Sequence, residues 1–347
     1  MTEPTPRPLP AMVLEAAESA EAARRQIERC GPLFHALGER LRSLQPRFVV
    51  TCARGSSDHA AAYGKYLIET GIGLPVASIG PSVASLYNAP LQLDGGLFIA
   101  VSQSGRSPDL LRLASAAQAS GAYVVSFVND ETSPLASQAD LFVPLCAGKE
   151  ASVAATKSYL TSALAFLQLA AHWRQDAGLL AAVAALPDTL AAAARLDWAP
   201  ALQRLATLPG FYVIGRGLGT GAANEIALKF KETCRLHAEA FSAAEVIHGP
   251  LELVRPGFGA LALTQDDRTL ESSRATIRRM VDLGAKVLAT AADMTGVVPL
   301  PVLPGLPPEV APLAAVQSFY MAVPNLAAMR GLDPDAPSNL KKVTETV

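Results

Sequence analysis

The sequence is poor in features on which several classes of protein depend. Only 17% of its 347 residues are charged, the formal net charge is −2, and 6% of the residues are aromatic. A nucleic-acid-binding surface needs clustered lysines and arginines, and the sequence contains no basic block. No apolar run reaches the roughly 20 residues of a membrane-spanning helix without a charge or a proline, and the first residues contain no apolar signal core. The composition therefore predicts a cytoplasmic, soluble protein that binds neither nucleic acid nor membrane.

Cysteine is also scarce. The four cysteines lie far apart in the sequence, at Cys30, Cys52, Cys146 and Cys234. None has the close spacing to another that a zinc site requires, so we expect no structural metal. Cys52 and Cys146 lie in or beside apolar, strand-like runs, where we expect small buried thiols.

What the sequence does contain is an internal repeat. Half of the residues are hydrophobic, enough for a large core, and the length suits two domains. Gly55 and Gly217 each follow a strand-like run and an arginine and precede a helical stretch. Ser102 and Thr264 each end a second apolar run. Both pairs are 162 residues apart (217 − 55 and 264 − 102).

Each repeat has the pattern strand, helix, strand, helix, strand. Gly121 and Gly284 follow the second helix of each repeat and suit the left-handed position that closes a last helical turn. Continuous apolar strands joined by helices indicate a parallel sheet that is covered on both faces. The sequence therefore predicts an α/β protein with two pseudo-symmetric, doubly wound parallel-sheet domains.

The repeat also predicts the domain boundaries. We expect an N-terminal tail and helix over 1–44, a first domain with the phosphate site over 45–175, a helical connection over 176–208, a second domain over 209–330 and a C-terminal tail over 331–347 that closes the active site. Residues 158–208 are rich in alanine and leucine. They predict two helices with a break at Pro187-Asp188.

The first repeat carries a candidate phosphate site. Ligands of open parallel sheets bind beyond the carboxyl ends of the strands, near helix N-termini. The loop 102–107 lies there, and its three serines and one glutamine precede Pro108, a favoured first helical residue. Hydroxyls beside free backbone amides suit a phosphate. The alternative is that these residues form an ordinary serine-rich helix cap and turn.

The second repeat favours the phosphate site over the ordinary cap. Asp266 and Asp267 stand where the first repeat has Ser104 and Gly105. Two carboxylates at this point would repel a phosphate. The second repeat therefore keeps the fold but lacks the residues that suit an anion. We therefore expect one phosphate site per chain.

A second group of candidate residues follows the second Arg-Gly turn. Lys229 and Glu232 are three apart on a predicted helix and therefore share a face, and His248 precedes Gly249-Pro250. Carboxylate and imidazole can move protons between neighbouring carbons and oxygens of a sugar near neutral pH. Taken alone, a pair such as Lys229–Glu232 is more often a surface ion pair. A metal site lacks compact ligand spacing here.

The sequence resembles the sugar isomerase (SIS) family along almost its whole length. It is most similar to the isomerase half of glucosamine-6-phosphate synthase and to related deaminases of the SIS type. The matching stretches are, in chain order, Ser102-Gln103-Ser104-Gly105, Glu150 with Ala154-Ala155-Thr156-Lys157, Leu228-Lys229-Phe230-Lys231-Glu232, His237-Ala238-Glu239-Ala240, His248-Gly249-Pro250-Leu251 and Asn339-Leu340-Lys341-Lys342.

The resemblance implies flavodoxin-like SIS domains and a substrate pocket. The residues that it assigns to the phosphate and the sugar are Ser56, Ser57, Ser102, Gln103, Ser104, Ser107, Val153 and Ala155. Ala155 stands where the family has a serine that touches the sugar, so one hydroxyl contact is lost. Arg106 replaces a residue that is often acidic, and either adds phosphate affinity or faces solvent.

The resemblance also implies the catalytic roles. Glu232 would move a proton between C1 and C2, and Lys229 would position Glu232 or a substrate oxygen. His248, supplied by the neighbouring subunit of a homodimer with a shared active site, would assist ring opening. Lys342 would meet the sugar carbonyl, although a slip of one residue would exchange its role with that of Lys341.

The expected function is that of an aminosugar-phosphate deaminase, which converts glucosamine 6-phosphate and water to fructose 6-phosphate and ammonia without a metal or an organic cofactor. We expect no glutamine-dependent synthesis by this chain alone, because no glutamine-hydrolysing domain precedes the first repeat. The alternatives are a deglycase of an amino-acid–sugar-phosphate conjugate, a plain isomerase and a non-catalytic sugar-phosphate sensor. Glu232, His248 and a tail lysine together argue against the sensor.

Overall fold

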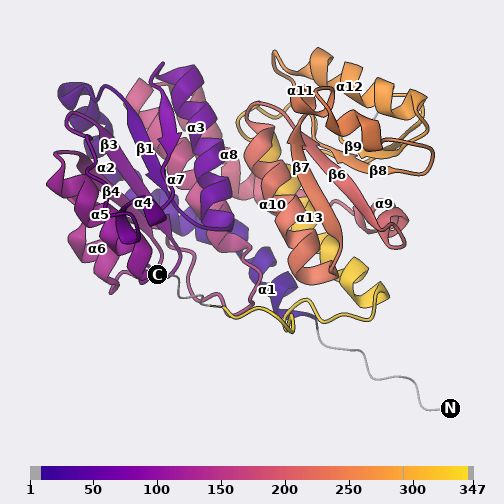
Figure 1. Ribbon diagram of the computed structural model, residues 1–347, viewed down its shortest axis with the longest axis horizontal. Coiled ribbons are helices and arrows are strands. Elements are labelled where there is room, and N and C mark those ends of the chain that lie inside the picture. The colour runs from indigo at the N-terminus through magenta and orange to yellow at the C-terminus, as the bar shows by residue number, and fades with distance from the viewer. Residues whose placement is uncertain (1–8, 292, 343–347) are drawn as a thin grey trace.

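The computed structural model describes residues 9–291 and 293–342, which form two α/β halves (Figure 1). The first half contains a five-stranded parallel sheet of strand order β2-β1-β3-β4-β5. Its strands are β1 (Val49–Cys52), β2 (Val76–Ser78), β3 (Leu97–Ser102), β4 (Tyr123–Val128) and β5 (Leu141–Pro144). The predicted parallel sheet is confirmed.

Both faces of this sheet are buried, as its continuous apolar strands predict. Successive strand residues point to opposite faces. Ile99 and Val101 of β3 belong to a core cluster with helices α2 (Ser19–Leu44), α3 (Ser56–Gly71) and α7 (Lys157–Arg174), whereas Phe98 and Ala100 pack with α5 (Pro108–Ala119) on the other face. Burial on two sides is what a doubly wound sheet requires.

The second half repeats the same arrangement. Its sheet has the strand order β10-β9-β8-β6-β7, again all parallel, which is the order of the first sheet read from the other edge. The strands are β6 (Gly210–Gly215), β7 (His237–Ser242), β8 (Gly259–Ala262), β9 (Lys286–Ala289) and β10 (Val297–Pro299). Gly121 and Gly284 have φ angles of 87° and 84°, so both occupy the predicted left-handed position. The two pseudo-symmetric sheet units are confirmed.

The remaining helices cover the sheets and join the halves. They are α1 (Ala11–Ala17), α4 (Ser82–Ser85), α6 (Pro134–Gln138), α8 (Ala177–Ala193), α9 (Ala199–Leu202), α10 (Gly219–Cys234), α11 (Ala243–Val246), α12 (Leu270–Asp282) and α13 (Ala311–Met329), with 3₁₀ turns η1 (Gln203–Leu205) and η2 (Pro250–Leu253). No helix in 9–291 and 293–342 has both the length and the apolar character needed to cross a membrane. The outer parts of both predicted tails, residues 1–8 and 343–347, lie outside the described residues.

The predicted helix break at Pro187-Asp188 is wrong. Pro187 lies inside α8, and the break between α7 and α8 comes earlier. Gln175 adopts a left-handed conformation with φ 53°, and the Asp176 side chain caps α8 by accepting a hydrogen bond from the Leu179 amide at 3.0 Å. A left-handed residue followed by a side-chain cap ends one helix and begins the next, whereas a proline can kink a helix without ending it.

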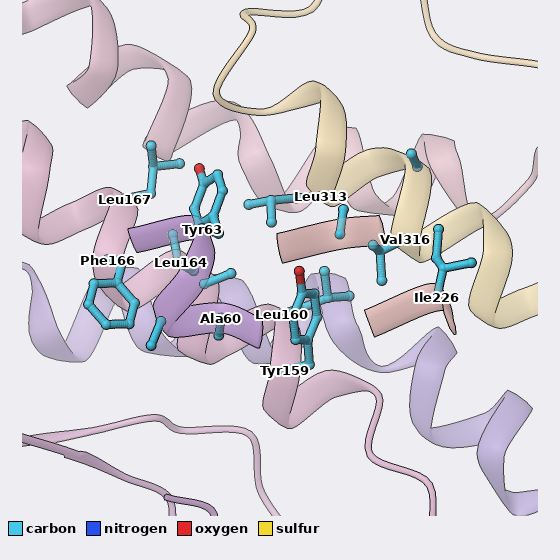
Figure 2. Packing of buried hydrophobic residues seen from close by; sticks show 14 of the residues in the cluster. Ala60, Tyr63, Tyr159, Leu160, Leu164, Phe166, Leu167, Ile226, Leu313 and Val316 are labelled. Carbon is cyan, nitrogen blue, oxygen red and sulfur yellow. The ribbon is translucent and has the colours of Figure 1, made fainter. Parts of the chain in front are cut away.

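The two halves share one hydrophobic core. Helices α3 and α7 of the first half pack against α10 and α13 of the second. Figure 2 shows Tyr63 and Tyr159 from the first half in the same cluster as Ile226 and Val316 from the second. The contact between α3 and α10 is close enough that a Cβ on Gly221 would lie 2.5 Å from the His59 carbonyl oxygen. This close packing holds the start of α3 beside the end of α10.

Candidate active site

The candidate site is a cavity of about 330 Å³ at the carboxyl edge of the first sheet. The loops that follow β1 and β3 form one wall. These strands are neighbours, and the sheet continues to β2 on one side and to β4 on the other, so the cavity lies at the point where ligands of open α/β sheets bind. Ten of the predicted site residues line it: Ser56, Ser57, Ser102, Gln103, Ser104, Ser107, Val153, Ala155, Glu232 and Lys342.

The loop 102–107 has the form of an anion cradle. The Gly105 amide donates to Ser102 Oγ at 2.9 Å, and Gly105 has a φ of 62°, where a Cβ would overlap Ser133. Ser107 precedes Pro108 at the start of α5, and the Ser107 side chain makes no capping hydrogen bond to that helix. The serine hydroxyls and the positive end of α5 therefore face one cavity, as a phosphate site requires.

An arginine at this edge was not among the predicted site residues. Arg54 lines the cavity, and its guanidinium donates to Asp109 Oδ2 from Nη2 at 2.6 Å and from Nε at 3.2 Å. The Asp109 side chain is fully buried, so it anchors the guanidinium while the Arg54 side chain remains half exposed. The repeated Arg-Gly turn, Arg54-Gly55 and Arg216-Gly217, is the sequence signal that pointed to this position.

Arg106, in contrast to Arg54, takes no part in the cavity. Its guanidinium donates to Asp130 Oδ2 from Nη2 at 2.8 Å and from Nε at 3.1 Å, and also to the Thr132 hydroxyl. Arg106 is half exposed and is not one of the residues lining the cavity. Of the two alternatives for this residue, the structure supports the one in which it faces solvent.

The opposite wall carries a carboxylate and a buried lysine. Lys229 Nζ donates to Glu232 Oε2 at 2.5 Å and to Ser56 Oγ at 3.0 Å. The Lys229 side chain is fully buried and the Glu232 side chain is 18% exposed, so only the carboxylate reaches the cavity. The two residues therefore do not form a surface ion pair. Ser56 comes from α3, and the contact joins the two halves at the site.

Behind this pair lies Glu225, which sequence analysis missed. It accepts hydrogen bonds from Ser56 Oγ at 3.1 Å, from Tyr320 OH at 2.7 Å and from the His59 ring at 2.9 Å, and it pairs with Lys229 at 3.3 Å. Burial by itself would raise the pKa of Glu225, but Lys229 and these donors lower it to about 2. The sequence placed Glu225 one helical turn before Lys229, and this spacing was the one sign that Glu225 belongs to the site. Its partners from α3 and α13 could not be inferred from the sequence.

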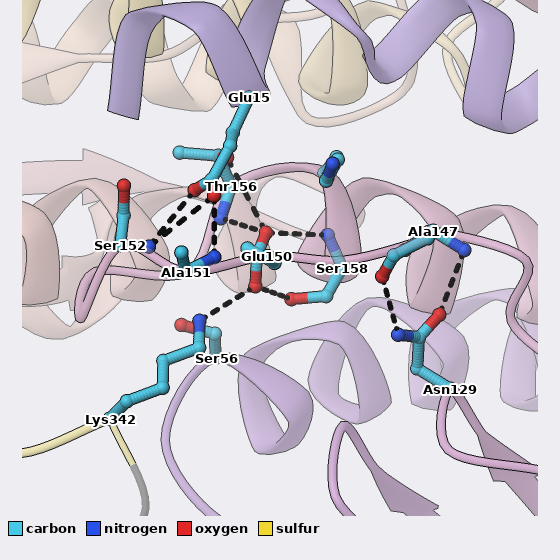
Figure 3. Close-up of polar contacts among 12 residues, drawn as sticks. Glu15, Ser56, Asn129, Ala147, Glu150, Ala151, Ser152, Thr156, Ser158 and Lys342 are labelled. Carbon is cyan, nitrogen blue, oxygen red and sulfur yellow. Dashed lines mark hydrogen bonds and ion pairs between the residues drawn. The ribbon is translucent and has the colours of Figure 1, made fainter. Parts of the chain in front are cut away.

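The tail meets the cavity through Lys342. Lys342 Nζ donates to Glu150 Oε2 at 3.0 Å, and Glu150 also accepts from the Ser158 hydroxyl at 2.6 Å and from the Thr156 amide at 3.0 Å (Figure 3). Burial would raise the pKa of Glu150, but Lys342 and these donors lower it below its usual value. Glu150 therefore holds the tail lysine as a charged pair. Lys341 also lines the cavity.

The predicted residue His248 and the stretch 237–240, which matches the family, lie elsewhere in the second half. His248 is exposed on the turn after α11 and is not among the residues that line the cavity. His237 and Glu239 are exposed on β7, at the edge of the second sheet. Within one chain, the described structure thus brings Glu232 to the sugar-sized cavity and leaves His248 outside it.

In the second half, polar side chains of the corresponding loop 264–269 are engaged in hydrogen bonds to other protein groups. Gln265 Nε2 donates to the Arg216 carbonyl at 2.8 Å, and Asp267 Oδ1 accepts from the Thr269 amide at 2.7 Å. The cavity beside this loop, about 260 Å³, is lined by Asp266 and by many apolar side chains. An acidic residue in this position disfavours a phosphate, in contrast to the serine hydroxyls of the first half.

Comparison with known proteins defines the class. The sequence profile of the SIS domain matches residues 45–172 and 210–294, one segment in each half. The chain therefore belongs to the SIS domain family. Its similarity to glutamine–fructose-6-phosphate aminotransferase (isomerizing) of Symbiobacterium thermophilum is 34% identity over 323 residues. That alignment covers 87% of this chain and 52% of the relative, so the chain spans about half the length of the curated relatives it matches.

Solved structures agree with this assignment. A candidate phosphosugar isomerase from Silicibacter pomeroyi DSS-3 is 43% identical, with a TM-score of 0.90 over 94% of this chain and 100% of that one. Glucosamine-6-phosphate deaminase from Thermotoga maritima has a TM-score of 0.77 at 19% identity, over 97% of this chain and 100% of that one. The second likeness establishes a shared fold.

Proposed function

We propose that the protein is an aminosugar-phosphate deaminase that converts glucosamine 6-phosphate and water to fructose 6-phosphate and ammonia. The observation that carries the proposal is one cavity in which the serine loop 102–107 faces Glu232 and Lys342. The loop suits the phosphate, and a carboxylate and an ammonium lie where they can act on the opposite end of an open sugar chain. The fold shared with a glucosamine-6-phosphate deaminase supports the choice of substrate.

The contacts of Glu232 suggest how the reaction proceeds. Lys229 donates to Oε2 of Glu232, which leaves Oε1 to accept the proton from C2 of the open aldose and return it to C1. The C1 oxygen takes up a proton and the C2 amine loses one, so the C1 carbonyl becomes a hydroxyl and C2 becomes an imine. Water then adds to C2 and ammonia leaves, which gives the ketose. Lys342, oriented by Glu150, donates a hydrogen bond to the C1 oxygen while charge develops there.

Ring opening needs a group that the single chain does not bring to the cavity. His248 is exposed and lies outside the cavity lining. An exposed imidazole is free to enter a neighbouring chain's cavity, and we propose a homodimer in which each subunit supplies His248 to its partner. Symmetric pairing of this kind gives two equivalent shared sites.

The decisive experiment measures both products from glucosamine 6-phosphate without added glutamine. We expect ammonia and fructose 6-phosphate in equal amounts. The Glu232→Gln variant should lose at least about 100-fold in kcat, since acid–base groups typically contribute about 10²–10⁴-fold, and should still bind the sugar phosphate. Glu252→Gln, an exposed carboxylate outside the cavity lining, is the matched control and should retain full activity.

Other outcomes identify the alternatives. Sugar-phosphate binding with neither product would exclude the deaminase; release of a free amino acid from a conjugate such as a fructosyl-amino-acid 6-phosphate would then establish a deglycase. Binding with no turnover of either substrate would indicate a sensor. A Glu232→Gln variant with more than about a hundredth of wild-type activity would remove Glu232 from the proton transfer.

A further inference from the structure

The first half contains a pair of thiols outside the sugar cavity. Cys30 lies in α2 and Cys146 lies two residues after β5, and their Sγ atoms are 3.9 Å apart. The prediction of a small buried thiol is correct for Cys52 but wrong for Cys146, which is only partly buried. The reason is that β5 ends at Pro144, so Cys146 belongs to the loop that follows rather than to the strand.

The surroundings of the two sulfurs differ. Cys30 is fully buried and its thiol donates to the Pro144 carbonyl at 3.3 Å. Cys146 opens onto a surface cavity of about 260 Å³ that is also lined by Arg25, Arg29 and Glu131, and the Arg29 guanidinium donates to both carboxylate oxygens of Glu131. A small oxidant can therefore reach Cys146 first, and the nearby guanidinium groups favour a thiolate there.

The electrostatics agree with this order. The hydrogen bond with Cys30 and the nearby Arg29 guanidinium lower the pKa of Cys146 to about 7, against the opposing effect of burial. The same hydrogen bond, together with burial, raises the pKa of Cys30. Cys146 is thus the thiol of the pair that ionises more readily, although the Glu131 carboxylate opposes this. Thiolate character and access determine which cysteine an oxidant attacks.

Bond formation requires the two sulfurs to approach each other. A disulfide requires about 2.05 Å between the sulfurs, so the pair must close by about 1.9 Å from its present 3.9 Å. Cys146 has a φ of 55°, a left-handed conformation that is unfavourable for a non-glycine residue. Cys146 also begins the segment 146–150, which we call the strap and which ends at Glu150, the partner of Lys342. Movement of the strap is the simplest way to bring the sulfurs together.

We propose that Cys30 and Cys146 form a reversible disulfide when the protein meets hydrogen peroxide, with Cys146 as the thiol that reacts first. The Cys146 thiolate attacks one peroxide oxygen, the O–O bond breaks, and the departing hydroxide takes up a proton to become water. Cys30 then attacks the resulting sulfenic acid at sulfur, the S–O bond breaks and a second water leaves. Two thiols are oxidised by two electrons, and the peroxide is reduced to two waters.

The strap connects this pair to the sugar cavity. Asn129 holds its centre, because the Ala147 amide donates to Asn129 Oδ1 at 2.8 Å and Asn129 Nδ2 donates to the Gly148 carbonyl at 2.9 Å (Figure 3). A disulfide would tie the start of the strap to α2 and displace its end, where Glu150 orients Lys342. Oxidation should therefore lower the turnover of glucosamine 6-phosphate, a consequence that rests on the proposed function.

The test is peptide mass spectrometry of the full chain after hydrogen peroxide, with free thiols blocked under denaturing conditions. We expect a peptide pair joined through Cys30 and Cys146, lighter by two hydrogens and separated by dithiothreitol. Cys52 and Cys234, both fully buried, are internal controls and should remain alkylatable. In C30S, Cys146 should stop at a sulfenic acid that dimedone traps; in C146S, Cys30 should stay reduced.

Three results would overturn the proposal: no Cys30–Cys146 peptide in the oxidised wild type, oxidation of Cys146 no faster than that of Cys52, or an equal yield of oxidised Cys30 in C146S. Activity is read separately, in wild type and C30S at the same peroxide dose. A disulfide with unchanged turnover would refute the link through Glu150. No turnover in the reduced protein would refute the proposed function, while the mass spectrum would still decide the thiol chemistry.

Discussion

Lys229 is the residue on which the charge balance of the site depends. It is fully buried between two carboxylates, Glu225 and Glu232. Burial alone would lower the pKa of Lys229, but the two carboxylates outweigh it and raise the pKa above its ordinary value. The ammonium therefore stays charged, and it allows α10 to carry an acid on either side of it, Glu225 and Glu232.

Removal of this charge should destabilise the fold. In Lys229→Met the buried Glu225 carboxylate loses its cation, and breaking a buried ion pair costs about 3–5 kcal/mol. Urea unfolding should show a loss of that size. Arg24→Met is the control: its side chain is 43% exposed and pairs with Glu21 and Asp188 at the surface, so a much smaller loss than in Lys229→Met is expected. Similar losses in the two variants would contradict this account of Lys229.

Glu225 makes the stability of the protein depend on pH. Its pKa is about 2 in the folded state and ordinarily 4.5. A lowered folded-state pKa adds stability that is complete above pH 4.5 and is lost as the pH falls toward 2. The contribution is on the order of 3 kcal/mol, of which about 2 kcal/mol is lost by pH 3.

Urea unfolding at pH 6 and pH 3 tests this dependence. The free energy of unfolding of Glu225→Gln should be lower than that of the wild type at pH 6 and should fall less between the two pH values. Glu252→Gln, which alters an exposed side chain, should show the wild-type difference. An identical pH difference in wild type and Glu225→Gln would show that Glu225 is not the group responsible.

At the scale of elements, the contact between α3 and α10 brings the two halves of the site together. His59 and Gly221 are 162 residues apart, so equivalent points of the two repeats touch. A Cβ on Gly221 would meet the His59 carbonyl oxygen at 2.5 Å and the Tyr63 amide nitrogen at 2.8 Å. Both are backbone atoms, which cannot swing away as a side chain can. Only glycine therefore permits this distance between the helices.

Gly221→Ala should separate the helices despite the better helix propensity of alanine. Overpacking costs typically about 1–3 kcal/mol, and the movement should also lengthen the Lys229–Ser56 contact and lower kcat. Gly71→Ala, at the end of α3, is the control, because its Cβ would meet only the flexible end of Arg174. Urea unfolding and turnover measure the two effects. A Gly221→Ala protein as stable and as active as Gly71→Ala would disprove the close contact.

For the whole molecule, the proposed shared site makes a prediction about mixtures. Glu232→Gln and His248→Ala should each be inactive alone. Co-expressed in equal amounts, half of the dimers are mixed, and each mixed dimer has one site with both wild-type groups, so about a quarter of wild-type activity is expected. Turnover of glucosamine 6-phosphate by the purified mixture measures this. Activity no higher than that of the two variants alone would place His248 and Glu232 in the same subunit's site, or His248 outside the reaction.

The sequence by itself determined the repeated α/β plan and the serine content of the loop 102–107, which we propose to hold the phosphate. The apolar strands and the glycines that end helices are local patterns, and the 162-residue repeat shows that these patterns occur twice in the same order. The structure confirms the fold that they predict. The serines of 102–107 could be found for the same reason, since one loop supplies them all and the second repeat shows the contrast at Asp266.

Tertiary structure alone decided which distant residues complete the site. Glu225 gains its role from Ser56, His59 and Tyr320, which lie up to 169 residues away and meet it only when α3, α10 and α13 pack together. The partner of Lys342, Glu150, is 192 residues distant. The thiol contact of Cys30 with Cys146 likewise arises only where α2 crosses the end of β5. Hydrogen bonds and charge pairs act over a few ångströms of space. When the two partners lie far apart in the sequence, no local sequence pattern indicates that they will meet.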